Sequence, residues 1–280
     1  MQGKLNTIKN VAWALSISVT LLALLLGLLF AAFTPNGGEL ERPQLVLGAA
    51  AVVESAAELP QAPIAAVQTE TGRLITLEET EDAGQPYLDS LVFLCDSTTI
   101  GLRDYGILSG GISTTQVWGA EGGSLPAAKL GDCLIRYPGD GSQISPAEAA
   151  MIVKPAILYV SVGQDGLMGV DHDIFVNNYG ALIRSIREAS PGTIIVCCSI
   201  TSVGPSYSGP DGLTNDKISW GNDWIMEVCK STGAYFCDVA HDMRDSTNVL
   251  NVDYASANLK TLNSAGLNAW LGFIRTHAVQ

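Results

Sequence analysis

Short apolar runs alternate with amphipathic helical patterns from about Tyr87 onward, and this alternation constrains the fold more than any other feature of the sequence. The runs have the length and the residue types of buried strands. They are "SLVFL" (90–94), "TTQVW" (114–118), "AILYVSV" (156–162), "TIIVCCSI" (193–200) and "AYFCDV" (234–239). Nearly continuous apolar strands separated by helices predict an α/β domain, in which helices cover both faces of a parallel sheet.

The intervening segments carry helix start and stop signals. Ser145-Pro146-Ala147-Glu148 is a capping box with proline at the first helical position. A helix is expected near 172–189, because the apolar residues there share one face. They are Phe175, Tyr179, Leu182, Ile183 and Ile186. A further helix is expected to end at Gly233, and the last helix is expected to follow Asn263.

The N-terminal segment from Val11 to Phe33 contains no charged residue and is rich in leucine. Its roughly 23 residues, at ~1.5 Å each, can cross a hydrocarbon core of ~30 Å. Lys4 and Lys9 precede it and no acid occurs before Glu39, so we expect a cytoplasmic N-terminus and an exported remainder. A cleaved signal peptide is the alternative, but its apolar region is normally shorter, and residues 31–34 form a poor cleavage site.

These signals divide the chain into four parts. We expect a cytoplasmic tail (1–10), a single transmembrane anchor (11–33), a flexible extracytoplasmic linker (34–86) and one folded domain (87–280). The linker is rich in Ala, Glu, Pro and Gly and has no sustained apolar period, although "GRLITLEE" within it can add a short strand.

Charge and cysteine content limit the function classes. The chain has 15 basic and 28 acidic residues, a poor balance for binding nucleic acid or anionic lipid, whose phosphates need Lys and Arg. The six cysteines show neither metal-ligand spacing nor the density of a disulfide scaffold. Most are expected to be buried thiols, and a disulfide between Cys229 and Cys237 is compatible with an oxidising compartment. No cofactor is expected.

The carboxyl ends of parallel strands are where an α/β domain places its site. Ser97 follows the first strand directly and opens the next helix, which is a good position for a nucleophile or an anion contact. The same position also suits a purely structural N-cap, because Asp96, Ser97 and Thr98 are all ordinary capping residues.

The order of segments resembles the SGNH (GDSL-type) hydrolase family over roughly residues 87–277. "YLDSLVFLCDSTTIGL" is similar to the family's Gly-Asp-Ser nucleophile block, with Ser97 as the nucleophile. "VWGAEGGS" is similar to the second block, with Gly122 at an oxyanion-hole position, and "LYVSVGQDGL" to the third, which starts at Gly163. "NLKTLNSAGLNAWL" is similar to the last block. The resemblance implies a three-layer, flavodoxin-like fold with sheet order 2-1-3-4-5 and an ester hydrolase ancestry.

Several block residues depart from the family's pattern. The glycine before Asp-Ser is Cys95, the oxyanion-hole asparagine is Asp165, and the triad aspartate and histidine are Asn258 and Thr261. Threonine cannot take a proton from a serine hydroxyl near neutral pH, and a carboxylate accepts hydrogen bonds but cannot donate one to an oxyanion. These losses predict a catalytically impaired site.

Other residues could supply a base or bind a metal. His172 and His241 are the two histidines that could replace the missing base, whereas His277 suits a last helical turn. The acidic residues around His172 match no calcium or zinc motif, so no metal is expected.

Two hypotheses follow. In the first, the domain is a silent hydrolase fold that binds a cell-envelope ligand, such as a glycan or an acylated wall polymer, or a partner at the old cleft. In the second, it is an active extracytoplasmic ester hydrolase or O-acyl transferase that uses Ser97 with a rearranged base. A base within hydrogen-bond reach of Ser97 would favour the second hypothesis.

Overall fold

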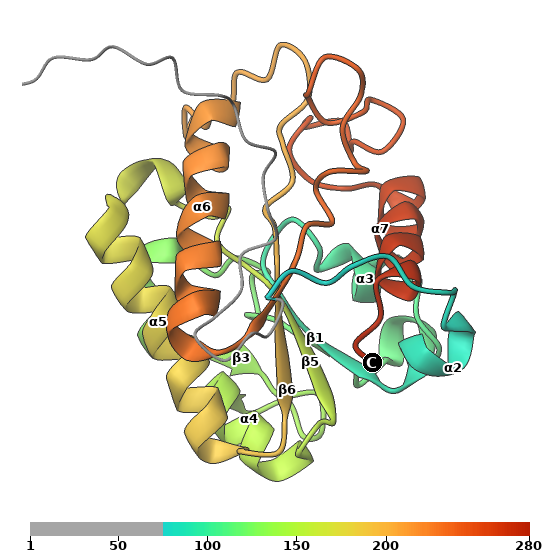
Figure 1. The fold of residues 1–280 in the computed structure, drawn as a ribbon, viewed down its shortest axis with the longest axis vertical. Coiled ribbons are helices and arrows are strands. Elements are labelled where there is room, and N and C mark those ends of the chain that lie inside the picture. Colours follow the sequence, from blue (N-terminus) through green and yellow to red (C-terminus); the bar gives the residue numbers. More distant parts are fainter. Residues whose placement is uncertain (1–74) are drawn as a thin grey trace, which may run out of the picture. The chain divides into compact units, whose positions relative to one another are not determined.

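A parallel sheet of five strands lies at the centre of residues 75–280, the part of the chain that the computed structural model describes (Figure 1). The strands are β1 (Leu91–Cys95), β2 (Val117–Trp118), β5 (Ile157–Ser161), β6 (Ile194–Cys198) and β7 (Tyr235–Cys237). Their spatial order is β2-β1-β5-β6-β7, and every neighbouring pair is parallel. The predicted strands and the predicted order 2-1-3-4-5 are confirmed.

Helices cover both faces of the sheet (Figure 1). They are α2 (Gly84–Asp89), α3 (Gly101–Asp104), α4 (Pro146–Val153), α5 (His172–Ala189), α6 (Asn215–Thr232) and α7 (Ser264–Thr276). Alternate residues of β1 point to opposite faces, so Leu94 joins the core under α5 and α6, whereas Phe93 packs against Trp270 of α7. The three-layer α/β architecture is therefore confirmed.

The helix ends follow the capping signals of the sequence. Ser145 and Glu148 form a reciprocal capping box at the start of α4. Gly233 ends α6 with a positive φ of 72°, a conformation that glycine adopts without a Cβ penalty. Asn263 caps α7 through its side chain, which accepts the backbone N–H of Gly266 at 2.9 Å. The Asn263 cap fixes where α7 begins, and the loop before α7 carries the last of the family blocks.

Some elements were not predicted. β3 (Ile135–Arg136) and β4 (Gln143–Ile144) form a short antiparallel hairpin, which a bridge between Gly119 and Arg136 attaches next to β2. Three 3₁₀ helices complete the described part: η1 (Gly111–Ser113), η2 (Ala127–Asp132) and η3 (Leu167–Gly169). Two-residue strands and single helical turns are too short to produce a periodic pattern.

Residues 75–86 are packed on the domain, although they fall in the span expected to be a linker. Ile75 is buried, and Thr76 pairs in parallel with Phe236 of β7, as the "GRLITLEE" stretch allowed. Further along, the carboxylate of Asp82 binds the guanidinium of Arg275 on α7. The folded unit therefore includes at least twelve residues before the expected boundary at 87.

The predicted anchor, residues 11–33, lies outside the described residues. Within residues 75–280, no helix has the length and apolar character that a membrane span requires.

All six cysteines are buried and free. Burial raises the pKa of the Cys198 thiol, which also contacts Cys237. Cys229 instead contacts Cys197, and this thiol–thiol hydrogen bond, together with burial, raises the pKa of Cys229. The structure therefore contains no Cys229–Cys237 disulfide, and the expectation of buried thiols is confirmed.

Candidate active site

Ser97 and Asp165 lie side by side at the carboxyl edge of the sheet. Ser97 is half-buried in the turn after β1, and Asp165 belongs to the loop after β5. β1 and β5 are parallel neighbours in which Cys95 is opposite Ser161, so the two loops leave the sheet at the same height. The predicted convergence of these two blocks is thus a direct result of strand order and register.

The carboxylate of Asp165 accepts three hydrogen bonds. Its Oδ1 accepts the Ser97 hydroxyl at 2.5 Å, and its Oδ2 accepts the backbone N–H groups of Ser97 at 3.2 Å and Leu125 at 3.1 Å. The residue is only 6% exposed. Both carboxylate oxygens are therefore satisfied by donors, which is what a buried carboxylate requires.

Lys260 adds a positive charge beside this pair. Its ammonium group lies 3.9 Å from Oδ1 of Asp165 and 2.8 Å from Oδ2 of Asp211, whose Oδ1 accepts the Tyr207 hydroxyl at 2.7 Å. Burial acts to raise the pKa of Asp211, but the hydrogen bonds from Lys260 and Tyr207 outweigh it and hold this pKa below its usual range. A chain of polar contacts thus runs from Ser97 to Tyr207.

Sequence reasoning did not single out Lys260, Asp211 or Tyr207. A signal for Lys260 was present, because it stands between Asn258 and Thr261 inside the last family block. The contact with Asp211 joins positions 49 residues apart, and no spacing rule predicts such a pair. These residues line an open cavity of about 520 Å³, formed by residues 206–211 and 257–260.

Asp96 lies beneath the pair and is fully buried. Its carboxylate accepts the backbone N–H groups of Thr98, Gly163 and Gln164 at 3.0 to 3.1 Å, which fastens the loop after β1 to the loop after β5. Burial, and then the negative charge of Asp165, raise the pKa of Asp96 to about 7. The loop geometry around Ser97 therefore depends on a carboxyl group that titrates near neutral pH.

The last block also reaches this edge, but its side chains bind each other. The Asn258 amide oxygen accepts the Thr261 N–H at 3.0 Å, and the Thr261 hydroxyl lies 3.2 Å from the same oxygen. Leu262, the next residue, donates its N–H to the Thr98 carbonyl at 3.4 Å. The block therefore lies next to the Ser97 loop, as expected. The Thr261 side chain, however, is hydrogen-bonded to Asn258.

Gly122 is exposed and, among the described residues, contributes no hydrogen bond to the Ser97–Asp165 pair. The backbone N–H that reaches Asp165 from this loop belongs to Leu125 instead. The role of Gly122 as an oxyanion donor stays a prediction.

The three histidines bind groups away from Ser97. His172 Nε2 lies 2.8 Å from the Glu227 carboxylate, and this hydrogen bond is the main cause that raises the pKa of His172. His241 is exposed and binds the adjacent Asp242, and His277 stacks on an aromatic ring of α7. Among residues 75–280, moreover, no three His, Cys, Asp or Glu side chains are grouped so as to hold a metal ion.

Comparisons with known proteins place these observations in a family. Two solved structures are similar to the chain: a protein described as a lipolytic protein of the G-D-S-L family from Desulfitobacterium hafniense, and one described as a GDSL-like lipase from Parabacteroides merdae. The first has 17% identity and a TM-score of 0.47, over 68% of this chain and 99% of that one. The second has 11% identity and a TM-score of 0.47, over 72% and 98%.

A carbohydrate esterase family 3 structure from Talaromyces cellulolyticus is also similar, with 14% identity and a TM-score of 0.39, over 66% of this chain and 93% of that one. No curated protein matches the chain. The sequence model of the GDSL-like lipase/acylhydrolase family matches residues 96–259, which is more than half of the 280 residues and contains both Ser97 and Asp165. The chain therefore belongs to the GDSL-like lipase/acylhydrolase family.

Proposed function

We propose that this domain is a GDSL-type fold in which ester hydrolysis is arrested and which binds a cell-envelope ligand. The observation that carries the proposal is the position of the Asp165 carboxylate. It accepts both the hydroxyl and the backbone N–H of Ser97. The side chain at the oxyanion asparagine's position thus occupies the donors that an oxyanion would need.

The chemistry of acyl transfer explains the arrest. When a serine attacks an ester carbonyl, the carbonyl oxygen becomes negative and is stabilised by N–H donors aimed at it. Here the backbone donors of Ser97 and Leu125 already serve a carboxylate, and that carboxylate would repel a second negative charge. Losing a single oxyanion donor typically costs ~2.7–4 kcal/mol of transition-state stabilisation, before any repulsion is counted.

The hydrogen bond between the Ser97 hydroxyl and Asp165 also favours the second hypothesis, an active hydrolase or acyl transferase, because it offers a path for the serine proton. The 2.5 Å hydrogen bond points the Ser97 proton at Asp165, so the carboxylate could accept this proton as the serine attacks. Lys260 would then balance the charge of the carboxylate. This reading gives Asp165 the role of base, but it leaves the oxyanion facing the same carboxylate.

The ligand is proposed from the polar cavity beside Lys260. Its lining combines a tyrosine ring, a lysine and carboxylate and amide groups, a combination suited to a glycan or an acylated wall polymer. We further propose that residues 11–33 hold the domain at the outer face of the cell membrane, because only there would such polymers be met. Protease added to intact cells should then remove the domain and leave a short protected fragment.

Reactivity of Ser97 separates the two hypotheses. The arrested site should resist labelling by a fluorophosphonate probe, and cleavage of a simple acetyl ester should be the same for the unmodified protein and for Ser97→Ala. Ester cleavage that is lost in Ser97→Ala, Asp165→Asn and Lys260→Ala alike would overturn the arrested reading in favour of the second hypothesis.

A reconstructed site provides the positive control. The combined changes Asp165→Asn, Asn258→Asp and Thr261→His should restore measurable hydrolysis, whereas each single change should do little, because triad and oxyanion groups act as a unit.

A further inference from the structure

A small polar cavity lies at the carboxyl edge of the sheet, where the ends of β1, β5 and β6 meet. Asp96 follows β1, Ser161 ends β5 and Thr201 belongs to the segment after β6, and all three residues line the cavity. Every residue of its lining is at most 7% exposed. The centre of a water molecule can occupy about 10 Å³ of this space, so the cavity has room for one water and for little more.

The Thr201 hydroxyl is buried in the wall of this cavity. The residue is only 1% exposed, and its Oγ1 has no hydrogen-bond partner among residues 75–280. The backbone carbonyl of the same residue, by contrast, accepts the side-chain amide of Gln164 at 3.2 Å. A buried hydroxyl without a partner is costly, so Thr201 points to a bound group that completes it.

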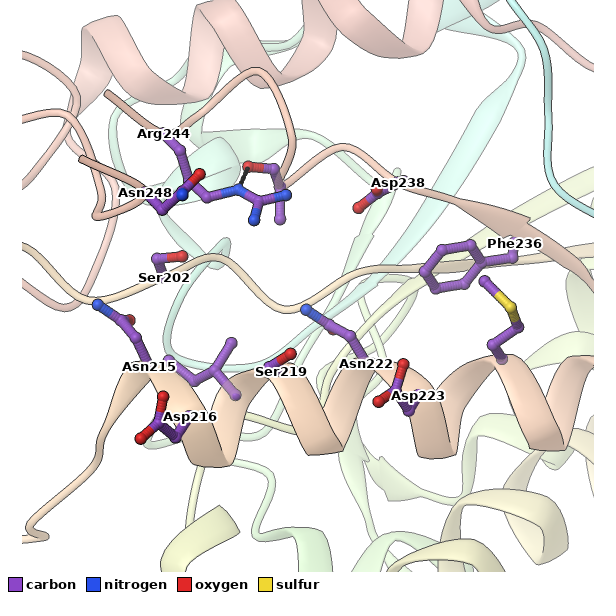
Figure 2. Close-up of a pocket in the computed structure, with 13 residues that line it drawn as sticks. Ser202, Asn215, Asp216, Ser219, Asn222, Asp223, Phe236, Asp238, Arg244 and Asn248 are labelled. Atoms are coloured by element: carbon purple, nitrogen blue, oxygen red, sulfur yellow. Dashed lines mark hydrogen bonds between the residues drawn. The ribbon is translucent and has the colours of Figure 1, made fainter. Parts of the chain in front are cut away.

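The next residue along the chain shows what sets Thr201 apart. Ser202 lines an open groove of about 410 Å³ between α6 and the segment after β7 (Figure 2). Solvent reaches the Ser202 hydroxyl in that groove and satisfies it. Thr201 does not line the groove, and its hydroxyl is shut off from bulk solvent. The partner of Thr201 therefore belongs in the inner cavity.

Two further hydroxyl groups in the wall have a proton left to donate. Oγ of Ser161 accepts the Thr99 hydroxyl at 3.1 Å, and Oγ of Ser199 accepts the Ala240 N–H at 2.8 Å. Neither serine hydroxyl donates a hydrogen bond to another group in the described part of the chain. Together with Thr201, three buried O–H groups thus border one small space without an acceptor.

We propose that this cavity binds one ordered water molecule, which accepts hydrogen bonds from Thr201 and from a neighbouring serine hydroxyl. The carboxylate of Asp96, in the same wall, can accept one of the water's own protons. The water then joins the ends of three parallel strands beneath the loop that carries Ser97. It acts as a structural part of the candidate site, bound where the chain's own backbone does not reach.

The chemistry of the wall selects water over an ion. The three hydroxyl protons need an acceptor, and a cation has no lone pair to offer them. An anion would be buried beside the carboxylate of Asp96, which repels it. A water molecule both accepts and donates, and a buried water typically makes about three hydrogen bonds. The small volume excludes a larger neutral molecule.

A high-resolution crystal structure of the full chain tests the proposal directly. One water should lie at about 3 Å from Oγ1 of Thr201 and from Oγ of Ser161 or Ser199. A cavity that contains no ordered water, or a Thr201 hydroxyl that is turned onto a protein carbonyl, would overturn the proposal.

A variant provides a second readout, in solution. Thr201→Val nearly keeps the shape of the side chain but replaces its hydroxyl by a methyl group. If the hydroxyl binds a water, the urea midpoint of the full chain in detergent should fall, because hydrogen bonds are lost. If the hydroxyl has no partner, its removal relieves a cost, and the midpoint should stay the same or rise. That second outcome would refute the water site.

Thr193→Val is the matched control. Thr193 is also buried, but its hydroxyl donates to the Pro155 carbonyl at 2.7 Å, so the midpoint of this variant should fall. The midpoint of Thr201→Val should fall by a similar amount. Ester cleavage plays no part in these readouts, so they stand apart from the arrested-hydrolase proposal.

Discussion

Ser97 and Asp165 form a closed pair, because the carboxylate accepts both the side-chain O–H and the backbone N–H of the serine. In a hydrolase of this family, the serine hydroxyl attacks the ester carbonyl, and the serine backbone N–H stabilises the oxyanion that this attack forms. In this chain the Asp165 carboxylate accepts hydrogen bonds from both of these groups of Ser97. Asp165, one of the residues that depart from the family's pattern, thus connects the loop of Ser97 to the loop of Leu125.

The first prediction concerns Asp165 and stability. Asp165→Asn should keep the free energy of unfolding within about 1 kcal/mol, because the amide oxygen can accept the two backbone N–H groups while its NH₂ donates to the Ser97 oxygen. Asp165→Ala leaves those N–H groups without a partner and should cost about 1–3 kcal/mol. Urea denaturation measures both. Equal stability of the two variants would show that the hydrogen bonds of this carboxylate do not hold the loops together.

The second prediction follows from Asp96, whose pKa is raised to about 7 in the folded protein. The unfolded chain releases this proton near pH 4, so between pH 4 and 7 the folded state binds more protons than the unfolded state. Stability contributed by this group should therefore fall as the pH rises from 5 to 7, by at most about 1.4 kcal/mol per pH unit, and then level off above pH 7. Denaturation midpoints at several pH values measure the slope.

Asp165→Asn is the control for that slope. It removes the negative charge that is the second cause of the raised pKa of Asp96, so the slope should become shallower. Burial, the main cause, remains. An unchanged slope in this variant would mean that the two carboxyl groups are not coupled.

The third prediction compares two glycines of α7. A Cβ at Gly266 would lie 2.4 Å from the Tyr254 carbonyl oxygen, so Gly266→Ala should force the helix away from the loop before it and cost about 1–3 kcal/mol. A Cβ at Gly272 meets nothing within 4 Å, and Gly272→Ala should be neutral or stabilising by up to about 1 kcal/mol. Thermal unfolding of the two variants provides the comparison, and a shift of the same sign in both would contradict it.

The fourth prediction concerns where the domain begins. A chain shortened to start at residue 75 should retain the stability of the folded domain, whereas one that starts at 87 loses the buried Ile75 and the pairing of Thr76 with Phe236. Burial of an aliphatic side chain of this size contributes about 1.5–3 kcal/mol, so the shorter chain should unfold at a clearly lower urea concentration. Identical denaturation midpoints would mean that residues 75–86 rest on the domain without stabilising it.

The sheet could be predicted from the sequence because its signals are local. Each strand is a short apolar run between turn residues, and each of the longer helices carries a cap or an apolar face that can be seen in one window of sequence. Residues 75–86 gave a weaker signal, because a single bridged residue beside β7 has no period of its own. The hairpin of β3 and β4 was not predicted for the same reason, because its two-residue strands are too short to show a period.

The arrangement of the candidate site was predicted in part. Block order identified Ser97 and Asp165, and the register of β1 and β5 brings them into contact. Nothing in the sequence showed that Asp165 would accept hydrogen bonds from Ser97, because that depends on a side-chain rotamer and on the distant Leu125. Lys260 was missed because it differs from the triad residues that the block comparison sought.

The pairing of Thr76 with Phe236 has a consequence for how copies of the protein behave toward each other. This pairing covers the outer edge of β7. At the opposite edge of the sheet, the bridge between Gly119 and Arg136 attaches the β3–β4 hairpin beside β2. An uncovered strand edge presents unpaired N–H and C=O groups that can recruit a strand from another molecule. A chain that begins at residue 87 would expose such a template on β7, and its preparations should self-associate with time.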